Sequence, residues 1–93
     1  MFGQFVESGP YALSLDNKPT PRSITWQKWA HIAYVDNPVG TGFSYTNSPD
    51  GVCQDQDCVG RNLDSFLDAF YAAYPQYKEN PLIIAGESYA YVS

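Results

Sequence analysis

Five residues near the end of the chain, 86–90 (Gly-Glu-Ser-Tyr-Ala), carry the clearest chemical pattern in the sequence. A serine that follows an apolar run and has small residues two positions before and after it is typical of a nucleophile elbow. In such an elbow the serine occupies a sharp turn between a strand and a helix, and neighbouring backbone passes close to the small residues. Ser88 is therefore a candidate nucleophile. The same pattern also arises by chance at turns that end strands, so both interpretations stay open on these residues alone.

The hydrophobic pattern indicates which elements would position Ser88. Residues 82–85 (Leu-Ile-Ile-Ala) are a short apolar run, which predicts a buried strand leading into the elbow. Residues 30–35 favour a second strand, ending before a proline. Between the two, apolar residues recur at helical spacing over about 57–74, and Pro75 should end this helix. The order strand, amphipathic helix, strand and elbow predicts an α/β fold built on a βαβ unit with adjacent parallel strands.

The N-terminal part of the chain is predicted to be extended. Residues 2–13 alternate between apolar and polar types around a break near Gly9, and the turn-rich residues 16–21 favour a hairpin end. Glu7 is the one charged residue among residues 2–13. By itself, such an acid is more often a solvated loop residue than a buried one.

Composition excludes several classes of partner. The chain has 93 residues with 44% hydrophobic content, which suits a folded interior of at most one small domain. Its net charge is −5 and its five basic residues are scattered, so neither nucleic acid nor a membrane surface is an expected partner. No run of about 18 apolar residues occurs, and the first residues do not have the pattern of a signal peptide. Oligomeric state cannot be read from the sequence.

The remaining chemically capable residues suggest no metal or cofactor. Two cysteines, Cys53 and Cys58, could close a local disulfide or remain free thiols, and with the single His31 far along the chain they do not form a zinc pattern. The glycines within residues 39–45 lack the spacing of a phosphate-binding loop. His31 is interpreted as a structural or exposed histidine, and Asp36 as a carboxylate that caps a turn.

Three motifs together resemble the serine carboxypeptidases, in particular the vitellogenic carboxypeptidase-like branch. They are residues 2–10 (Phe-Gly-Gln-Phe-Val-Glu-Ser-Gly-Pro), residues 36–45 (Asp-Asn-Pro-Val-Gly-Thr-Gly-Phe-Ser-Tyr) and residues 86–90. They occur in the family's order and, with the helix between them, cover essentially the whole chain. The resemblance implies a partial α/β-hydrolase fold, with residues 1–93 as part of a single domain that is incomplete at both ends.

The resemblance also assigns roles. It implies a serine-type carboxypeptidase that hydrolyses the C-terminal peptide bond of peptides and proteins through an acyl-enzyme on Ser88, without a cofactor. The backbone N–H of Tyr89 matches one of two oxyanion-hole donors. Glu7 and Glu87 match two acids that recognise the terminal carboxylate of the substrate, which requires a proton between them and favours acidic pH. A secreted, lysosomal or vacuolar location is implied by the same resemblance.

The sequence also departs from the family pattern. The family's W-x-N-G-G-P-G loop, which brings the second oxyanion donor, has no equivalent here, and the triad Asp and His follow the serine in family sequences. This chain order excludes His31 as the catalytic base. Family sequences also place a glycine and one more residue between the matches of Ala90 and Tyr91. We therefore expect a fragment; the alternatives are a truncated, inactive product that acts at most as a binding module, and another α/β-hydrolase such as an esterase.

Overall fold

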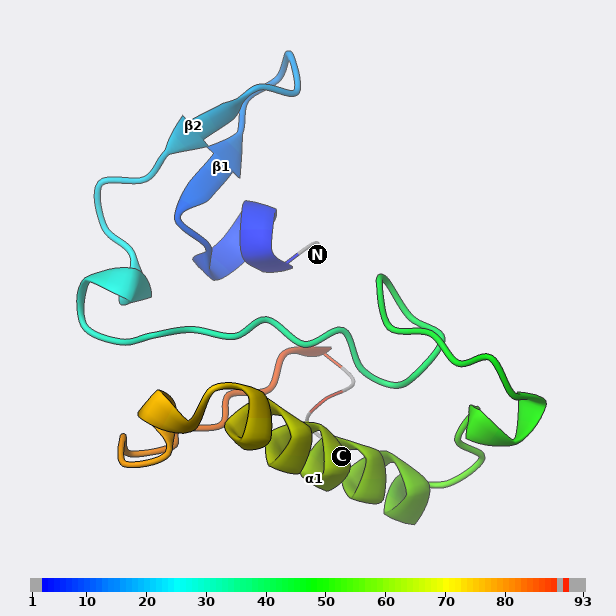
Figure 1. Ribbon diagram of the computed structural model, residues 1–93. Coiled ribbons are helices and arrows are strands. Elements are labelled where there is room, and N and C mark those ends of the chain that lie inside the picture. Colours follow the sequence, from blue (N-terminus) through cyan, green and yellow to red (C-terminus); the bar gives the residue numbers. More distant parts are fainter. Residues whose placement is uncertain (1–2, 89, 91–93) are drawn as a thin grey trace. The chain divides into compact units, whose positions relative to one another are not determined.

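The computed structural model describes residues 3–88 and residue 90. It separates into two compact units, the N-terminal unit Met1–Asp36 and the C-terminal unit Asn37–Ser93. Figure 1 shows the elements, which in chain order are η1 (Gln4–Ser8), β1 (Tyr11–Leu13), β2 (Pro19–Pro21), η2 (Trp26–Lys28), η3 (Pro49–Gly51), α1 (Gln56–Ala73) and η4 (Pro75–Tyr77). Among the described residues, no helix combines the length and the apolar character that crossing a membrane requires.

The predicted hairpin is confirmed in the N-terminal unit. Strands β1 and β2 pair antiparallel, and Ala12 lies opposite Thr20 in their register. The turn between them closes through a hydrogen bond of 3.0 Å from the backbone N–H of Ser14 to the carbonyl of Lys18. Asn17 supplies the left-handed backbone that this turn needs, with φ of 60°.

An exposed carboxylate stabilises the end of this hairpin. Ser14 donates a hydrogen bond to Asp16, and the Lys18 ammonium lies 2.9 Å from the same carboxylate. The Ser14 hydrogen bond, followed by that of Lys18, lowers the pKa of Asp16 below its ordinary value. Because the folded pKa is depressed, this stabilisation is present at neutral pH and is lost as the pH falls through the folded pKa.

Residues 4–8 are helical, which corrects the expectation of extended backbone at the start of the chain. They form the short π-helix η1, and two of its main-chain carbonyls accept hydrogen bonds from the Arg22 guanidinium. Gly9 follows it and is buried, and a Cβ on this glycine would lie 1.7 Å from the carbonyl oxygen of Gln4. The Arg22 contacts join residues 15 and 17 positions apart, so the local pattern of residue types did not indicate them.

The two predicted strands at residues 30–35 and 82–85 are not formed. Residues 31–37 and 81–87 have no regular secondary structure, and the sheet among the described residues contains only β1 and β2. A strand requires a neighbour to which its N–H and C=O groups can bond. Neither segment pairs with a strand among the described residues, and Leu82, Ile83 and Ile84 are 54%, 86% and 77% exposed. The structure therefore does not confirm the parallel βαβ unit.

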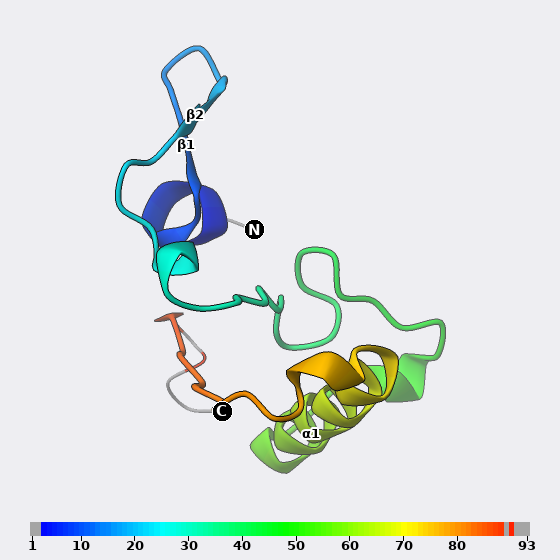
Figure 2. The ribbon, with the colours of Figure 1, turned by 60° about the vertical axis from the view of Figure 1, so that its left-hand side comes forward.

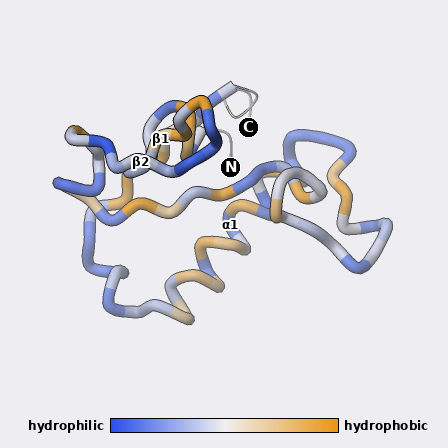
Figure 3. The backbone as a smooth tube through the Cα atoms, turned by 90° about the horizontal axis from the view of Figure 1, so that it is seen from above, coloured by the Kyte–Doolittle hydropathy of each residue, from blue (hydrophilic) through white to orange (hydrophobic). Residues whose placement is uncertain are grey.

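The predicted helix is confirmed as α1. Asp55 caps its N-terminus, because the Asp55 carboxylate accepts a hydrogen bond of 2.7 Å from the backbone N–H of Cys58. The helix ends at Ala73, directly before the predicted stop at Pro75, with Tyr74 as the C-cap. Val59 on its apolar face is 5% exposed. Apolar and polar residues alternate along α1 in Figure 3, as a half-buried helix requires.

Aromatic rings cover the C-terminal half of α1. The Phe70 ring lies 6.1 Å from Phe66, 5.6 Å from Tyr71 and 5.2 Å from Tyr74, measured between centroids. The helix η4 follows α1 directly and places the Tyr77 ring stacked on Phe70, at 6.1 Å. Figure 2 shows this continuation of α1 into η4. These contacts hold the segment that leads from α1 toward Ser88.

Cys53 and Cys58 form a disulfide, which settles the alternative that the sequence left open. Their Cα atoms lie 5.4 Å apart, and the side-chain amide of Asn62 donates to the Cys53 sulfur at 3.1 Å. The bond is possible because Cys53 precedes α1 while Cys58 lies in its first turn. Two cysteines inside one helix at this spacing would point apart.

Two glycines with equally open surroundings should respond oppositely to alanine. Among the described residues, a Cβ on Gly60 within α1 or on Gly40 in the turn of residues 38–44 would have no heavy atom within 4 Å. Gly60 is helical, so Gly60→Ala should raise the free energy of unfolding by about 0.5–1 kcal/mol. Gly40 has φ of 97°, so Gly40→Ala should lower it by about 1–2 kcal/mol. Denaturant unfolding of both variants in the same protein measures this; effects of equal sign would contradict it.

Candidate active site

The predicted nucleophile lies in a tight and unusual turn. Ser88 has φ of 58°, in the left-handed region that residues other than glycine rarely adopt. The turn is closed by a hydrogen bond of 3.2 Å from the backbone N–H of Ala90 to the carbonyl of Glu87. Backbone of this kind persists only where its surroundings enforce it, and it is frequent at functional sites. Ser88 is exposed, so its hydroxyl is accessible to a substrate.

The geometry of the turn explains why residues 86 and 90 are small. A Cβ on Gly86 would lie 3.1 Å from the carbonyl oxygen of Ala90, and 3.2 Å from both its carbonyl carbon and its Cβ. These separations are shorter than ordinary van der Waals contact, so any side chain at residue 86 would press against the backbone of residue 90. The close approach that a nucleophile elbow requires is therefore present around Ser88.

The other predicted site residues are placed as follows. Glu87 is exposed and precedes Ser88 in the same turn of the C-terminal unit. Glu7 is exposed on η1 of the N-terminal unit, with its Oε2 atom 3.4 Å from the position that a Cβ on Gly3 would occupy. Tyr89, the predicted oxyanion donor, lies outside the described residues. Their roles in catalysis and binding remain predictions.

Residues 37–93 supply no histidine that could accept the proton of Ser88. This stretch contains no histidine, because the single histidine of the sequence is His31. A serine hydroxyl is a weak nucleophile unless an adjacent base accepts its proton. The turn can present a serine hydroxyl, and a histidine that activates it would have to come from another segment.

The loop of the second family motif is held by its own backbone. Gly40 and Gly42 have φ of 97° and 53°, and the N–H of Gly40 donates to the carbonyl of Ser44 at 2.9 Å. Thr41 donates two hydrogen bonds to the carbonyl of Pro38, one from its backbone N–H at 3.1 Å and one from its hydroxyl at 2.7 Å. The glycines of this motif thus serve a compact turn.

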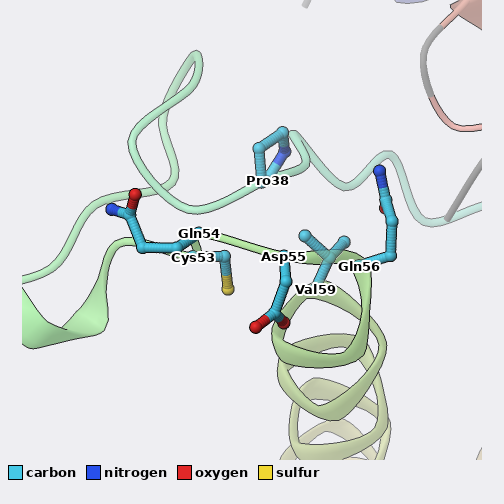
Figure 4. A pocket seen from close by; sticks show the side chains of 6 residues that line it. All are labelled: Pro38, Cys53, Gln54, Asp55, Gln56 and Val59. Atoms are coloured by element: carbon cyan, nitrogen blue, oxygen red, sulfur yellow. The ribbon is translucent and has the colours of Figure 1, made fainter.

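An open hollow of about 390 Å³ lies at the start of α1. Figure 4 shows its lining side chains, which are Pro38, Cys53, Gln54, Asp55, Gln56 and Val59. None of the predicted site residues lies in it. Among the described residues, no group of three or more His, Cys, Asp or Glu side chains could hold a metal ion.

One residue with a clear structural role near Glu7 was not indicated by any motif. The Arg22 guanidinium donates hydrogen bonds to the carbonyls of Glu7 and Phe5 in η1, which lie 15 and 17 residues earlier in the sequence. Sequence reasoning treated it as one of five scattered cations, because such a contact leaves no local pattern.

Comparison with known proteins gives a consistent result along the chain. The family model described as "Serine carboxypeptidase" matches residues 1–92. The probable serine carboxypeptidase CPVL of Dictyostelium discoideum is 51% identical over 90 residues, covering 96% of this chain and 18% of the relative. The vitellogenic carboxypeptidase of Aedes aegypti is 39% identical, covering 96% of this chain and 19% of the relative. No solved structure gave a significant match.

A human relative, also described as a probable serine carboxypeptidase CPVL, is 43% identical over 97% of this chain and 19% of its own length. The chain thus spans about a fifth of the length of the curated relatives that it matches. A family model that covers nearly every residue, together with relatives of this identity, identifies the chain as a member of the serine carboxypeptidase family.

Proposed function

We propose that this chain supplies the nucleophile-bearing part of a serine carboxypeptidase, which releases the C-terminal residue from peptides and proteins. The observation that carries the proposal is the turn at Ser88, where a serine with φ of 58° sits between Gly86 and Ala90 in close approach. An exposed serine that is held in this strained conformation is suited to act as a nucleophile, because strained backbone is frequent at functional sites and the hydroxyl is accessible. Family membership makes hydrolysis of a peptide bond the reaction that fits it.

The reaction would proceed through an acyl-enzyme. The Ser88 hydroxyl attacks the carbonyl carbon of the last peptide bond while a base from another segment takes its proton. Charge then develops on the carbonyl oxygen, where the N–H of Tyr89 would be one of two donors. The amine leaves with a proton, and water hydrolyses the ester on Ser88.

Glu7 and Glu87 would select substrates that end in a free carboxylate. Glu87 is adjacent to Ser88 and exposed, so its side chain can reach a group bound beside the nucleophile. A carboxyl group donates a hydrogen bond to a carboxylate only when it is protonated. An esterase does not need two such acids, which favours the carboxypeptidase over that alternative.

Membership of the family implies the α/β-hydrolase fold, and the hairpin and α1 are compatible with it. Within this fold, residues 1–93 would be part of one domain that continues beyond both ends of the chain. Residues 30–35 and 82–85 would become neighbouring parallel strands once the rest of the sheet provides ladder partners, with α1 crossing between them.

The disulfide supports the proposed location. Disulfides such as Cys53–Cys58 persist in oxidising environments and are rare where glutathione keeps thiols reduced. A secreted, lysosomal or vacuolar protein fits this chemistry.

The direct test uses the full-length protein that contains this chain. It should shorten a peptide by one residue at its C-terminus, detected by mass spectrometry, and it should act far more slowly on the same peptide with a C-terminal amide. Hydrolysis of simple esters without any shortening of peptides would favour the esterase alternative. No reaction with either substrate would favour an inactive binding module.

The pH dependence tests Glu87 separately. In the proposed complex, Glu7 and Glu87 share one proton when they bind the C-terminal carboxylate of the substrate. Peptidase activity should therefore fall toward neutral pH, by up to about tenfold per pH unit. Glu87→Gln donates a hydrogen bond without that proton, so it should flatten the fall. Glu79→Gln, at another exposed acid of the same unit, is the matched control and should keep the original profile. An unchanged profile in Glu87→Gln would remove Glu87 from this role.

A further inference from the structure

The short helix that carries Glu7 is held in place by one side chain from outside it. Arg22 Nη1 donates to the carbonyl of Glu7 and Arg22 Nη2 to the carbonyl of Phe5, each at 3.0 Å. A helix of five residues does not persist in water without tertiary support. No side chain caps the N-terminus of η1, so the two bonds from Arg22 are its clearest polar support among the described residues.

Arg22 is itself positioned by the hairpin. It directly follows β2, and its backbone N–H donates to the carbonyl of Pro10 at 2.8 Å, which extends the pairing of β1 with β2 by one further bond. The guanidinium therefore projects from a fixed backbone onto η1. It is half-buried, and its Nε atom is buried with no acceptor among the described residues. Such a placement costs free energy, which the hydrogen bonds from the two terminal nitrogens, Nη1 and Nη2, offset.

The geometry points to Arg22 as a positioning residue for substrate recognition, which orients Glu7 toward the terminal carboxylate of the peptide. One of its two bonds is to the main chain of Glu7 itself, so this contact sets where the Glu7 side chain begins. The Glu7 carboxylate is exposed beside Gly3 and remains available to a substrate. Arg22 acts through Glu7 and does not touch substrate; the inference therefore rests on the proposed function.

Arginine is required here because of the geometry of its side chain. Its planar guanidinium reaches two carbonyls two residues apart with two donors in a fixed fork. A lysine ammonium is a compact charge on one nitrogen, so it can donate well to one of these two carbonyls but not to both. Arg22→Lys should therefore lose part of the effect, and Arg22→Met, which keeps most of the aliphatic length without a donor, should lose nearly all of it.

Peptide binding to the full-length protein tests the inference. In a Ser88→Ala background, which prevents turnover, the Kd is measured by calorimetry for one peptide with a free C-terminal carboxylate and for the same peptide with a C-terminal amide. The ratio of the two Kd values reports carboxylate recognition. We expect Arg22→Met to lower the preference for the free acid at least fivefold, and Arg22→Lys to give an intermediate value.

Two controls separate positioning from stability. Lys18→Met removes an exposed cation at the end of the same hairpin and should leave the ratio unchanged. If Arg22 acts through Glu7, the double variant Glu7→Ala/Arg22→Met should be no worse than Glu7→Ala alone, because alanine already removes the group that Arg22 positions. A purely structural role of Arg22 would weaken both peptides equally, leave the ratio unchanged and overturn the inference.

The failure of the proposed function has a different signature. If the protein with Arg22 intact shows no preference for the free acid, the role of Glu7 is wrong and the inference falls with it. If that preference is present and survives Arg22→Met and Arg22→Lys in folded protein, the role of Glu7 stands and the inference about Arg22 alone is wrong.

Discussion

Replacing Ser88 by alanine in the full-length enzyme is expected to lower kcat/KM for peptide hydrolysis by about 10⁴- to 10⁶-fold, the range seen when a serine nucleophile is removed. The reason is that the acyl-enzyme cannot form, and only binding and oxyanion stabilisation remain to assist direct attack by water. The turn should survive, because alanine is no larger than serine. The measurement is steady-state kinetics together with labelling by a fluorophosphonate probe, which the variant should not take up.

The matched control for this substitution is Ser23→Ala. Ser23 is exposed and lies outside the three family motifs, so both its kinetics and its labelling should equal those of the unmodified enzyme. Retention of more than a hundredth of the activity in Ser88→Ala would assign the nucleophile to another residue and would leave the turn at residue 88 without its proposed use.

The second large effect is expected at Gly86, where valine should lower kcat/KM by about 10²-fold or more. A Cβ at residue 86 would lie 3.1 Å from the carbonyl oxygen and 3.2 Å from the carbonyl carbon of Ala90, so a side chain there would press on this carbonyl group. The backbone must move apart by a few tenths of an ångström for a methyl group and further for a branched side chain. A displacement approaching 1 Å at a nucleophile costs about 10²-fold in rate. Fluorophosphonate labelling rates should fall in parallel.

A graded series separates this steric effect from general damage. Gly86→Ala should be affected less than Gly86→Val, and Ala90→Gly alone should be tolerated because it keeps a small residue at that position. One of the three close atoms is the Ala90 Cβ, whereas the other two belong to its carbonyl. The pair Gly86→Ala/Ala90→Gly should therefore recover part, and only part, of the loss. Full activity in Gly86→Val would show that the close approach has no role in the reaction.

The features that the sequence predicted well are those determined by neighbouring residues. The spacing of apolar residues and Pro75 located α1 to within one residue at each end, because a helix forms its hydrogen bonds within its own segment. The hairpin was located by its turn residues, among which Asn17 adopts the left-handed conformation. The small residues around Ser88 predicted close backbone approach, which the structure shows at Gly86.

The features that it missed depend on residues far along the chain. The apolar run at 82–85 has the composition of a strand, but strand pairing requires a partner that the described residues do not offer. Residues 4–8 belong to a stretch that was expected to be extended, yet they form a short helix, two of whose carbonyls accept hydrogen bonds from the distant Arg22. A periodic pattern describes what a segment can bury, and it does not identify the distant group that satisfies its backbone.

The exposed residues Leu82 to Ile84 bear on the kinetics by which the longer protein reaches its native state. The backbone hydrogen bonds of α1 lie within its own segment, so it can form within microseconds once its residues are available. If the run at 82–85 pairs as proposed, it has to wait for strands contributed from elsewhere, and closing such long loops is slow. During that interval, a short run of bulky apolar residues with free N–H and C=O groups is a template for pairing between molecules. Recombinant production of the full-length protein should therefore depend on chaperones and low temperature, with misassembly beginning at this run.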